Sequence, residues 1–133
     1  MFKLNDVCVA VLSTVFGAVA VSGQGCANID ANGAATFPPG TQTIGAEAFY
    51  GCTALKSVII PNTVRTIGDE AFGVATSLVT VKFEPGSVVE SLGNYAFNSC
   101  TALKSIDIPK TVLTVGLDAF LGATKLESVT FAP

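Results

Sequence analysis

Apolar residues recur along this chain in a pattern that repeats every 23 to 25 residues. An aliphatic residue, a glycine, two variable positions and then Ala-Phe occur four times. The four copies are IGAEAF (44–49), IGDEAF (67–72), LGNYAF (92–97) and VGLDAF (115–120). Their glycines are separated by 23, 25 and 23 residues. A repeat of this length is typical of a solenoid, in which each coil of chain stacks on the previous one.

A short strand is predicted in each coil, because a leucine follows each phenylalanine by six residues and begins a stretch of alternating residues. In the first coil, Val58 and Ile60 alternate with Ser57 and Ile59, which is the period of a β-strand. The same alternation recurs in LVTVKFEP, LKSIDIP and LESVTFAP. A proline closes each stretch, where its missing N–H breaks no ladder hydrogen bond.

The glycine of each copy is expected to turn the chain, and the following segment to form a short helical turn. This turn would direct its alanine and phenylalanine into the core. The predicted spine consists of Phe49, Phe72, Phe97 and Phe120. Upstream, TFPPGTQTIG (36–45) matches the second half of a coil, since Pro38 precedes Gly45 by the same seven residues that separate Pro61 from Gly68. About four coils preceded by a half-coil are therefore expected.

The first residues of the chain have the features of a secretory signal. Residues 7–21 carry no charge and follow Lys3, and the small residues Ala18 and Ala20 precede a plausible cleavage point. We assign residues 1–23 to a signal peptide, 24–35 to an N-terminal leading segment and 36–133 to the solenoid, with the mature N-terminus expected between residues 20 and 28. An uncleaved membrane anchor and a soluble strand are the alternatives for the first segment.

Composition and charge exclude several classes of function. The chain has no histidine, so Ser-His-Asp triads, Cys-His pairs and histidine-containing zinc sites are excluded. Seven basic and ten acidic residues give a net charge of -3 with no basic cluster, which argues against nucleic-acid binding. No nucleophile has a base partner, and neither a metal site nor a cofactor site is predicted. We therefore expect no enzymatic activity.

The pattern I-G-x-x-A-F-x-x-C-x-x-L-x-x-V-x-I-P-x-x-V, which IGAEAFYGCTALKSVIIPNTV matches almost position for position, resembles the BspA-type leucine-rich repeat. The resemblance covers residues 36–133. It departs in the second and fourth coils, where Ala75 and Ala123 replace the cysteine. The resemblance implies a right-handed β-solenoid with a parallel concave sheet, an exported or surface location, and a role in adhesion or protein recognition without catalytic residues.

The cysteines are interpreted as core residues. Cys52 and Cys100 hold the same position two coils apart, which places their Cα atoms about 10 Å from one another, beyond the ~7 Å limit of a disulfide. Free buried thiols are expected at both. Cys26 lies outside the repeats, and whether it pairs stays open.

The acidic residues of the turns are interpreted as solvated side chains that form no joint carboxylate site. These residues are Glu47, Asp69, Glu70 and Asp118. Asp30, between Asn28 and Asn32, lacks the downstream glutamate of a calcium loop.

The outward positions of the predicted concave sheet are the candidate binding surface, which we call the outer strip. It comprises Ser57, Ile59, Thr80, Lys82, Ser105, Asp107, Ser128 and Thr130. We expect a non-catalytic, secreted or cell-surface module that binds a protein or glycan through this strip. The alternative is a structural fragment of a longer repeat array without a binding role of its own.

The last coil ends without a polar cap, so its apolar cross-section is expected to be exposed. That cross-section comprises Val115, Phe120, Leu126, Val129 and Phe131. Self-association through this end, or continuation in a longer protein, is expected.

Overall fold

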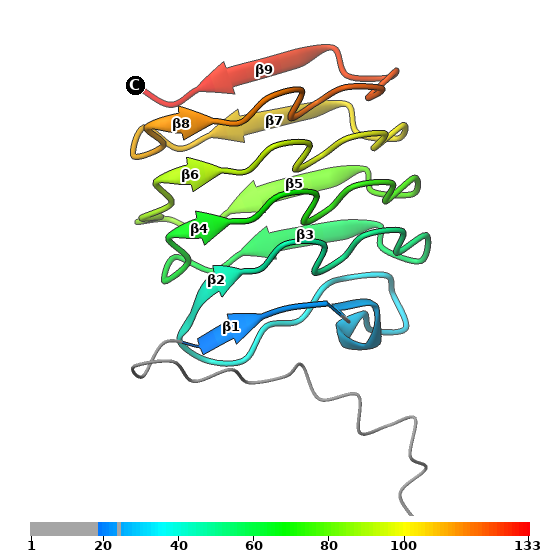
Figure 1. The fold of residues 1–133 in the computed structure, drawn as a ribbon, viewed down its shortest axis with the longest axis horizontal. Helices are drawn as coiled ribbons and strands as arrows, with labels where there is room; N and C mark the ends of the chain where they lie inside the picture. The colour runs from blue at the N-terminus through cyan, green and yellow to red at the C-terminus, as the bar shows by residue number, and fades with distance from the viewer. Residues whose placement is uncertain (1–18, 24) are drawn as a thin grey trace, which may run out of the picture.

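The chain folds as a stack of parallel coils. The computed structural model describes residues 19–23 and 25–133 (Figure 1). One side of the stack is a four-stranded parallel sheet of β3 (Ser57–Ile60), β5 (Thr80–Phe83), β7 (Ser105–Ile108) and β9 (Ser128–Phe131). A second sheet consists of β1 (Val19–Val21), β2 (Thr41–Ile44), β4 (Thr66–Ile67), β6 (Ser91–Leu92) and β8 (Thr114–Val115). The β-solenoid predicted from the repeats is confirmed.

The strands form where the repeat pattern places alternating residues. In β3, Val58 and Ile60 are buried while Ile59 is exposed, and the parallel pairing with β5 aligns Val58 with Val81. The strands β3, β5 and β7 therefore send one face of side chains into a continuous core, whereas β8 and β9 of the last coil are exposed. The alternation read from the sequence is sufficient to explain this burial.

The number of coils differs slightly from the prediction, because the second sheet has five strands. The additional strand is β1, which pairs in parallel with β2 and aligns Val21 with Ile44. Val21 is completely buried, so it occupies the core position held by Ile44 and Ile67 in later coils. The solenoid thus has about five turns, where the sequence predicted four and a half.

The predicted signal peptide overlaps this first turn. Its residues 1–18 lie outside the described part of the chain, whereas residues 19–21 form β1. The expected cleavage window of residues 20–28 spans β1 and the 3₁₀ helix η2 (Gly25–Asn28). Cleavage within that window would remove some or all of the pairing between β1 and β2.

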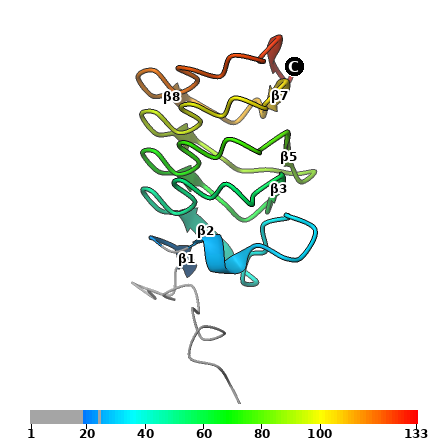
Figure 2. The same cartoon turned by 90° about the vertical axis from the view of Figure 1, so that its right-hand side faces the viewer.

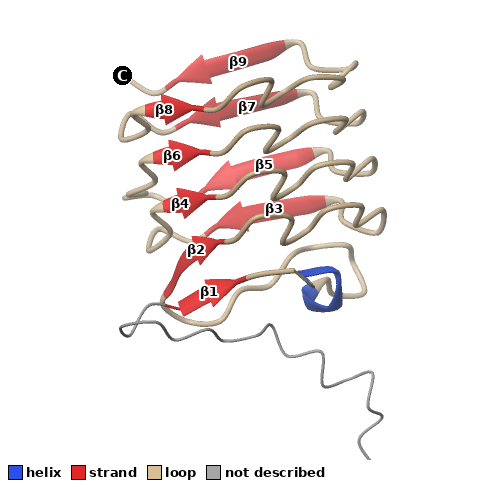
Figure 3. Cartoon of the chain, in the orientation of Figure 1, coloured by secondary structure: helices blue, strands red, loops and turns tan. Residues whose placement is uncertain are grey.

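The Ala-Phe segments are tight turns, which corrects the helical turn predicted for them. Glu47, Glu70, Tyr95 and Asp118 hold the same position in successive coils and have φ values of 55°, 52°, 56° and 50°. A residue with positive φ cannot continue a right-handed helix. The turns close instead through hydrogen bonds such as that from the Ala48 N–H to the Gly45 carbonyl. Among the described residues, η2 is the one helical element (Figure 3).

These turns stack directly on one another (Figure 2). The N–H groups of Glu47, Phe49 and Gly51 donate to carbonyls of the next coil, at distances of 2.9, 2.7 and 2.8 Å. The same three bonds recur between the later coils. Backbone hydrogen bonding therefore continues around the coil through segments that are not strands.

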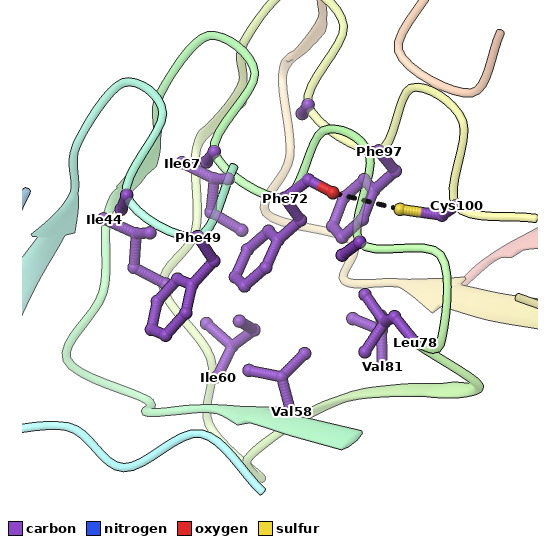
Figure 4. Packing of buried hydrophobic residues seen from close by; sticks show 14 of the residues in the cluster. Ile44, Phe49, Val58, Ile60, Ile67, Phe72, Leu78, Val81, Phe97 and Cys100 are labelled. Atoms are coloured by element: carbon purple, nitrogen blue, oxygen red, sulfur yellow. Dashed lines mark hydrogen bonds between the residues drawn. The ribbon is translucent and has the colours of Figure 1, made fainter. Parts of the chain in front are cut away.

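The phenylalanines of the predicted spine lie inside the stacked turns. The ring centroids of Phe49 and Phe72 are 5.2 Å apart, and those of Phe72 and Phe97 are 5.3 Å apart. Phe120 extends the series at 5.6 Å from Phe97. The rings are nearly parallel, with interplanar angles of 7°, 4° and 4°. Figure 4 shows the rings of Phe49, Phe72 and Phe97 in this stack. The rings of Phe49, Phe72 and Phe97 are fully buried among the aliphatic side chains of both sheets.

The close stacking of neighbouring coils leaves no space for a side chain at the turn glycine. A Cβ built on Gly93 would lie 2.4 Å from the backbone nitrogen of Asp69, and one on Gly116 would lie 2.4 Å from that of Asn94. These glycines are required because backbone approaches backbone. Ser22 occupies the corresponding position in the first described turn, where no described coil lies beneath it.

Cys26 and Cys52 form a disulfide, so the predicted free thiol at Cys52 is wrong. Their Cα atoms are 5.3 Å apart. The spacing of the repeats excludes a bridge between Cys52 and Cys100. However, η2 folds over the first complete coil, where Gly25 donates its N–H to the Ala48 carbonyl, and this brings Cys26 to Cys52. Cys100 is a buried free cysteine, as predicted.

Candidate functional site

The outer strip lies on the exposed face of the four-stranded sheet. Parallel pairing in register arranges its residues in two columns across the strands. The first column is Ser57, Thr80, Ser105 and Ser128, paired across all four strands. In the second column Ile59 pairs with Lys82 and Asp107 pairs with Thr130, while Lys82 and Asp107 are not paired with each other. Within β3, β5 and β7 these positions alternate with the buried residues Val58, Val81 and Ile106, whereas all four residues of β9 are exposed.

The strip presents small hydroxyl groups beside one aliphatic and two charged side chains. Ile59 is 56% exposed although it is strongly apolar, while Lys82 and Asp107 are also exposed. Thr130 donates its hydroxyl hydrogen to the carboxylate of Asp107. A surface of this composition can form hydrogen bonds and a local apolar contact, and it carries no excess of either charge.

Two hollows that the sequence patterns did not reveal lie beside the outer strip. Their volumes are about 310 and about 280 Å³, and both are lined by Phe83 and Asp107. The signal in the sequence was the 25-residue coil with its additional residue before Pro85. This irregularity does not by itself indicate a hollow.

The acidic residues of the turns do not form a joint site. Glu47, Glu70 and Asp118 occupy the same turn position on different coils. Asp69 has a structural contact, since its carboxylate accepts a hydrogen bond of 2.8 Å from the Asn94 N–H. Within residues 19–23 and 25–133, no cluster of histidine, cysteine or acidic side chains is arranged to hold a metal ion.

Cys100 is the free cysteine of the described region, and its environment suppresses thiol reactivity. Its Sγ lies 3.1 Å from the Phe72 carbonyl oxygen (Figure 4). Burial raises the pKa of Cys100 from 9.0 to about 12, partly offset by a backbone hydrogen bond from Ala75. The thiolate required of a nucleophile is therefore essentially absent at neutral pH.

Comparison with protein families identifies the repeat. The profile of the BspA type leucine rich repeat region matches residues 25–133 in six copies. The chain belongs to this family. The BspA-type repeats thus cover both the predicted solenoid and most of the segment before it.

Solved structures of bacterial leucine-rich repeat proteins resemble this BspA-type solenoid. A protein from Bacteroides capillosus is 31% identical with a TM-score of 0.63, over 70% of this chain and 64% of its own. The pneumococcal vaccine antigen PcpA is 27% identical with a TM-score of 0.63, over 69% of this chain and 22% of its own. A leucine-rich cell surface protein from Faecalibacterium prausnitzii is 25% identical with a TM-score of 0.58, over 88% of this chain and 36% of its own.

The BspA-type chain therefore spans less than two thirds of each of these proteins. The comparison with curated proteins gave no significant match. No helix among the described residues of this chain has the length and apolar character needed to cross a membrane.

Proposed function

We propose that this protein is a non-catalytic binding module, secreted or held at the cell surface, that recognises a protein or glycan ligand through the outer strip. The observation that carries the proposal is the exposed, mixed surface of the four-stranded sheet. None of its side chains belongs to the buried core, and its exposed Ile59 lies among polar groups. Apolar anchors surrounded by polar residues are typical of recognition surfaces.

Three further observations support the location outside the cytosol. The Cys26–Cys52 disulfide is typical of proteins that mature in an oxidising compartment. The similar structures include a vaccine antigen and a cell surface protein. The uncharged segment of residues 7–21 supplies the expected export signal.

Sequencing the N-terminus of the secreted chain tests export. A mature N-terminus at or before Val19 would retain β1, whereas cleavage between residues 20 and 28 would disrupt its pairing with β2. An intact Met1 on a cytosolic protein would contradict the proposed location.

A second candidate is a structural segment of a longer repeat array. This candidate is favoured because the chain covers less than two thirds of the length of each protein it resembles. In that case the outer strip would be solvated surface without a ligand.

Binding of the oxidised chain to arrays of extracellular-matrix proteins and glycans separates the two candidates. The test variant is Ile59→Glu, and the matched control is Leu113→Glu. Both residues are exposed aliphatic side chains, at 56% and 81%, but Leu113 lies outside the outer strip. We expect Ile59→Glu to weaken binding by at least about tenfold and Leu113→Glu to leave it unchanged. Binding by neither protein nor glycan, or equal effects of both variants, would favour the structural segment.

A further inference from the structure

The four-stranded sheet is interrupted between β5 and β7. The pairs β3–β5 and β7–β9 each align four residues. The pair β5–β7 aligns only Thr80 with Ser105 and Val81 with Ile106. Beyond this point, Lys82 and Phe83 have no ladder partners in β7, so the ladder opens along the second half of both strands.

The interruption follows from the coil of 25 residues and from Pro109. At the ends of the intact pairs, Glu84 donates its N–H to the Ile60 carbonyl, and Ala132 donates to the Ile108 carbonyl. The residue at the equivalent end of β7 is Pro109, which has no N–H. The bond that would hold β7 against the end of β5 therefore cannot form.

The opening produces the two hollows beside the outer strip. One is lined by Val81, Lys82, Phe83 and Asp107. The other continues around the ends of the strands, where Glu84, Ser87 and Lys110 join Phe83 and Asp107. Phe83 is only partly buried, whereas Ile60 and Ile108, which hold the same position in their coils, are fully buried. The interruption thus exposes part of an aromatic side chain between the strands.

The side chains around Phe83 combine apolar and hydrogen-bonding groups without a dominant charge. Lys82 and Lys110 are balanced by Glu84 and Asp107, and Ser87 supplies a hydroxyl group. Carboxylates accept hydrogen bonds, ammonium groups donate them, and a hydroxyl does both. The absence of a dominant charge disfavours polyanionic or polycationic ligands.

We propose that the β5–β7 opening binds a neutral sugar ring of a glycan. A sugar ring has an apolar C–H face that can cover Phe83 and Pro109, and hydroxyl groups that can exchange hydrogen bonds with Asp107 and Lys110. Hollows of about 300 Å³ have the size of small-ligand sites. This inference rests on the proposed function and narrows its ligand to one class.

An extended peptide fits the opening less well. Addition of a peptide strand requires a free sheet edge several residues long. Here β5 and β7 remain joined through Thr80–Ser105 and Val81–Ile106, and the opening is confined to the following two residues of β5. A compact ligand can enter this space without separating the strands.

Titration of the oxidised, isotope-labelled chain with methyl pyranosides of glucose, galactose, mannose and N-acetylglucosamine tests the proposal by amide NMR. We expect at least one sugar to shift the amides of residues 81–84 and 107–111. Asp107→Asn should weaken that binding by about tenfold or more, because a charge-assisted hydrogen bond is lost. Asp118→Asn, an exposed carboxylate on a turn, is the matched control and should leave it unchanged.

Phe83→Ile provides the second variant, since isoleucine holds this position in the first and third complete coils. It should fold, as judged by amide dispersion, and weaken sugar binding by about tenfold or more. Shifts by sugars on β3 alone, or shifts by short peptides in place of sugars, would overturn the sugar site and leave the proposed function standing. If no sugar shifts these amides and no ligand on the arrays binds the chain, both the sugar site and the proposed function are overturned.

Discussion

Two turn positions in every coil require a left-handed backbone, and their residues differ in how well they tolerate it. The second of these positions holds Gly51, Val74, Ser99 and Gly122, with φ values of 67°, 57°, 55° and 74°. Glycine adopts this conformation without steric cost, whereas a β-branched residue does so poorly. Val74 is thus the strained member of the set.

We expect Val74→Gly to raise the free energy of unfolding by roughly 0.5 to 1 kcal/mol. Relief of the left-handed conformation contributes about 1 to 2 kcal/mol, and the greater backbone freedom of glycine in the unfolded chain offsets part of it. Urea titration measures the change. The reciprocal variant, Gly51→Val, should lower stability at the same turn position. A loss of stability in Val74→Gly would show that the packing of the half-buried valine outweighs its strain.

The buried thiol of Cys100 should make stability fall at alkaline pH. Its pKa is raised from 9.0 to about 12 by burial, so below pH 9 the thiol is neutral in both states and its contribution is fully present. Above pH 9 the unfolded chain releases a proton that the folded chain retains. The free energy of unfolding should then fall by about 1.4 kcal/mol per pH unit until the pKa of the folded state is reached.

Cys100→Ala removes this titration and is compatible with the fold, because Ala75 and Ala123 occupy the same position in other coils. The difference in stability between the wild type and this variant should therefore depend on pH above 9 and be constant below it. Denaturant unfolding at pH 8 and pH 10.5 provides the comparison. Parallel pH profiles for the two proteins would mean that Cys100 ionises equally in both states.

At the scale of the element, the stacked phenylalanines distinguish interior coils from the terminal one. Phe97 lies between Phe72 and Phe120, with centroid distances of 5.3 and 5.6 Å. Phe120 contacts one ring of the stack and is only partly buried. Phe97→Ala should therefore cost about 3 to 5 kcal/mol, and Phe120→Ala clearly less. Equal, small effects in urea titrations would refute an energetic role for the ring stack.

The disulfide fastens the first turn to the first complete coil. Cys26 and Cys52 are separated by 26 residues, so closing this loop should stabilise the chain by about 3 kcal/mol. We expect the double variant Cys26→Ala/Cys52→Ala to lose that amount in denaturant unfolding. A reducing agent should destabilise the wild type and leave the variant unaffected. Identical unfolding midpoints for the disulfide-bonded wild type and the double variant would exclude a stabilising role of the disulfide.

At the scale of the whole molecule, the two ends of the stack differ. The first turn is covered in part by η2 and tied by the disulfide. The last coil exposes large apolar side chains, among them Leu117 at 64%, Leu121 at 55% and Phe131 at 64%. The edges of β8 and β9 beside them have no partner within the described residues. Exposed edges and apolar surface favour association.

We propose that the isolated chain self-associates through this surface. Light scattering over a concentration series should show an apparent mass that rises with concentration. Leu121→Lys combined with Phe131→Lys should keep the chain monomeric, while Tyr50→Lys, an exposed residue of the first complete coil, should not. A wild-type chain that stays monomeric throughout the series would contradict the proposal.

The repeats alone determined the solenoid, the strands of the four-stranded sheet and the outward positions of the strip, because one short-range pattern recurs in register and each coil constrains the next. Leu55, Val58 and Ile60 are buried where their spacing placed them. The turns differ from the predicted helical turn because the stacked backbone imposes a positive φ on residues such as Glu47, which local propensity does not reveal. Propensity is local, and that constraint comes from the neighbouring coil.

Tertiary structure decided the features that depend on residues outside the repeat pattern. Cys26 has no counterpart in the repeats, so only the path of η2 over the first coil brings it to Cys52. Val21 joins the core because β1 pairs with β2, although the surrounding uncharged segment is typical of an export signal. The β5–β7 opening arises where a longer coil meets Pro109 on the next one. Each depends on which chain segments become neighbours in the stack, and no local pattern contains that information.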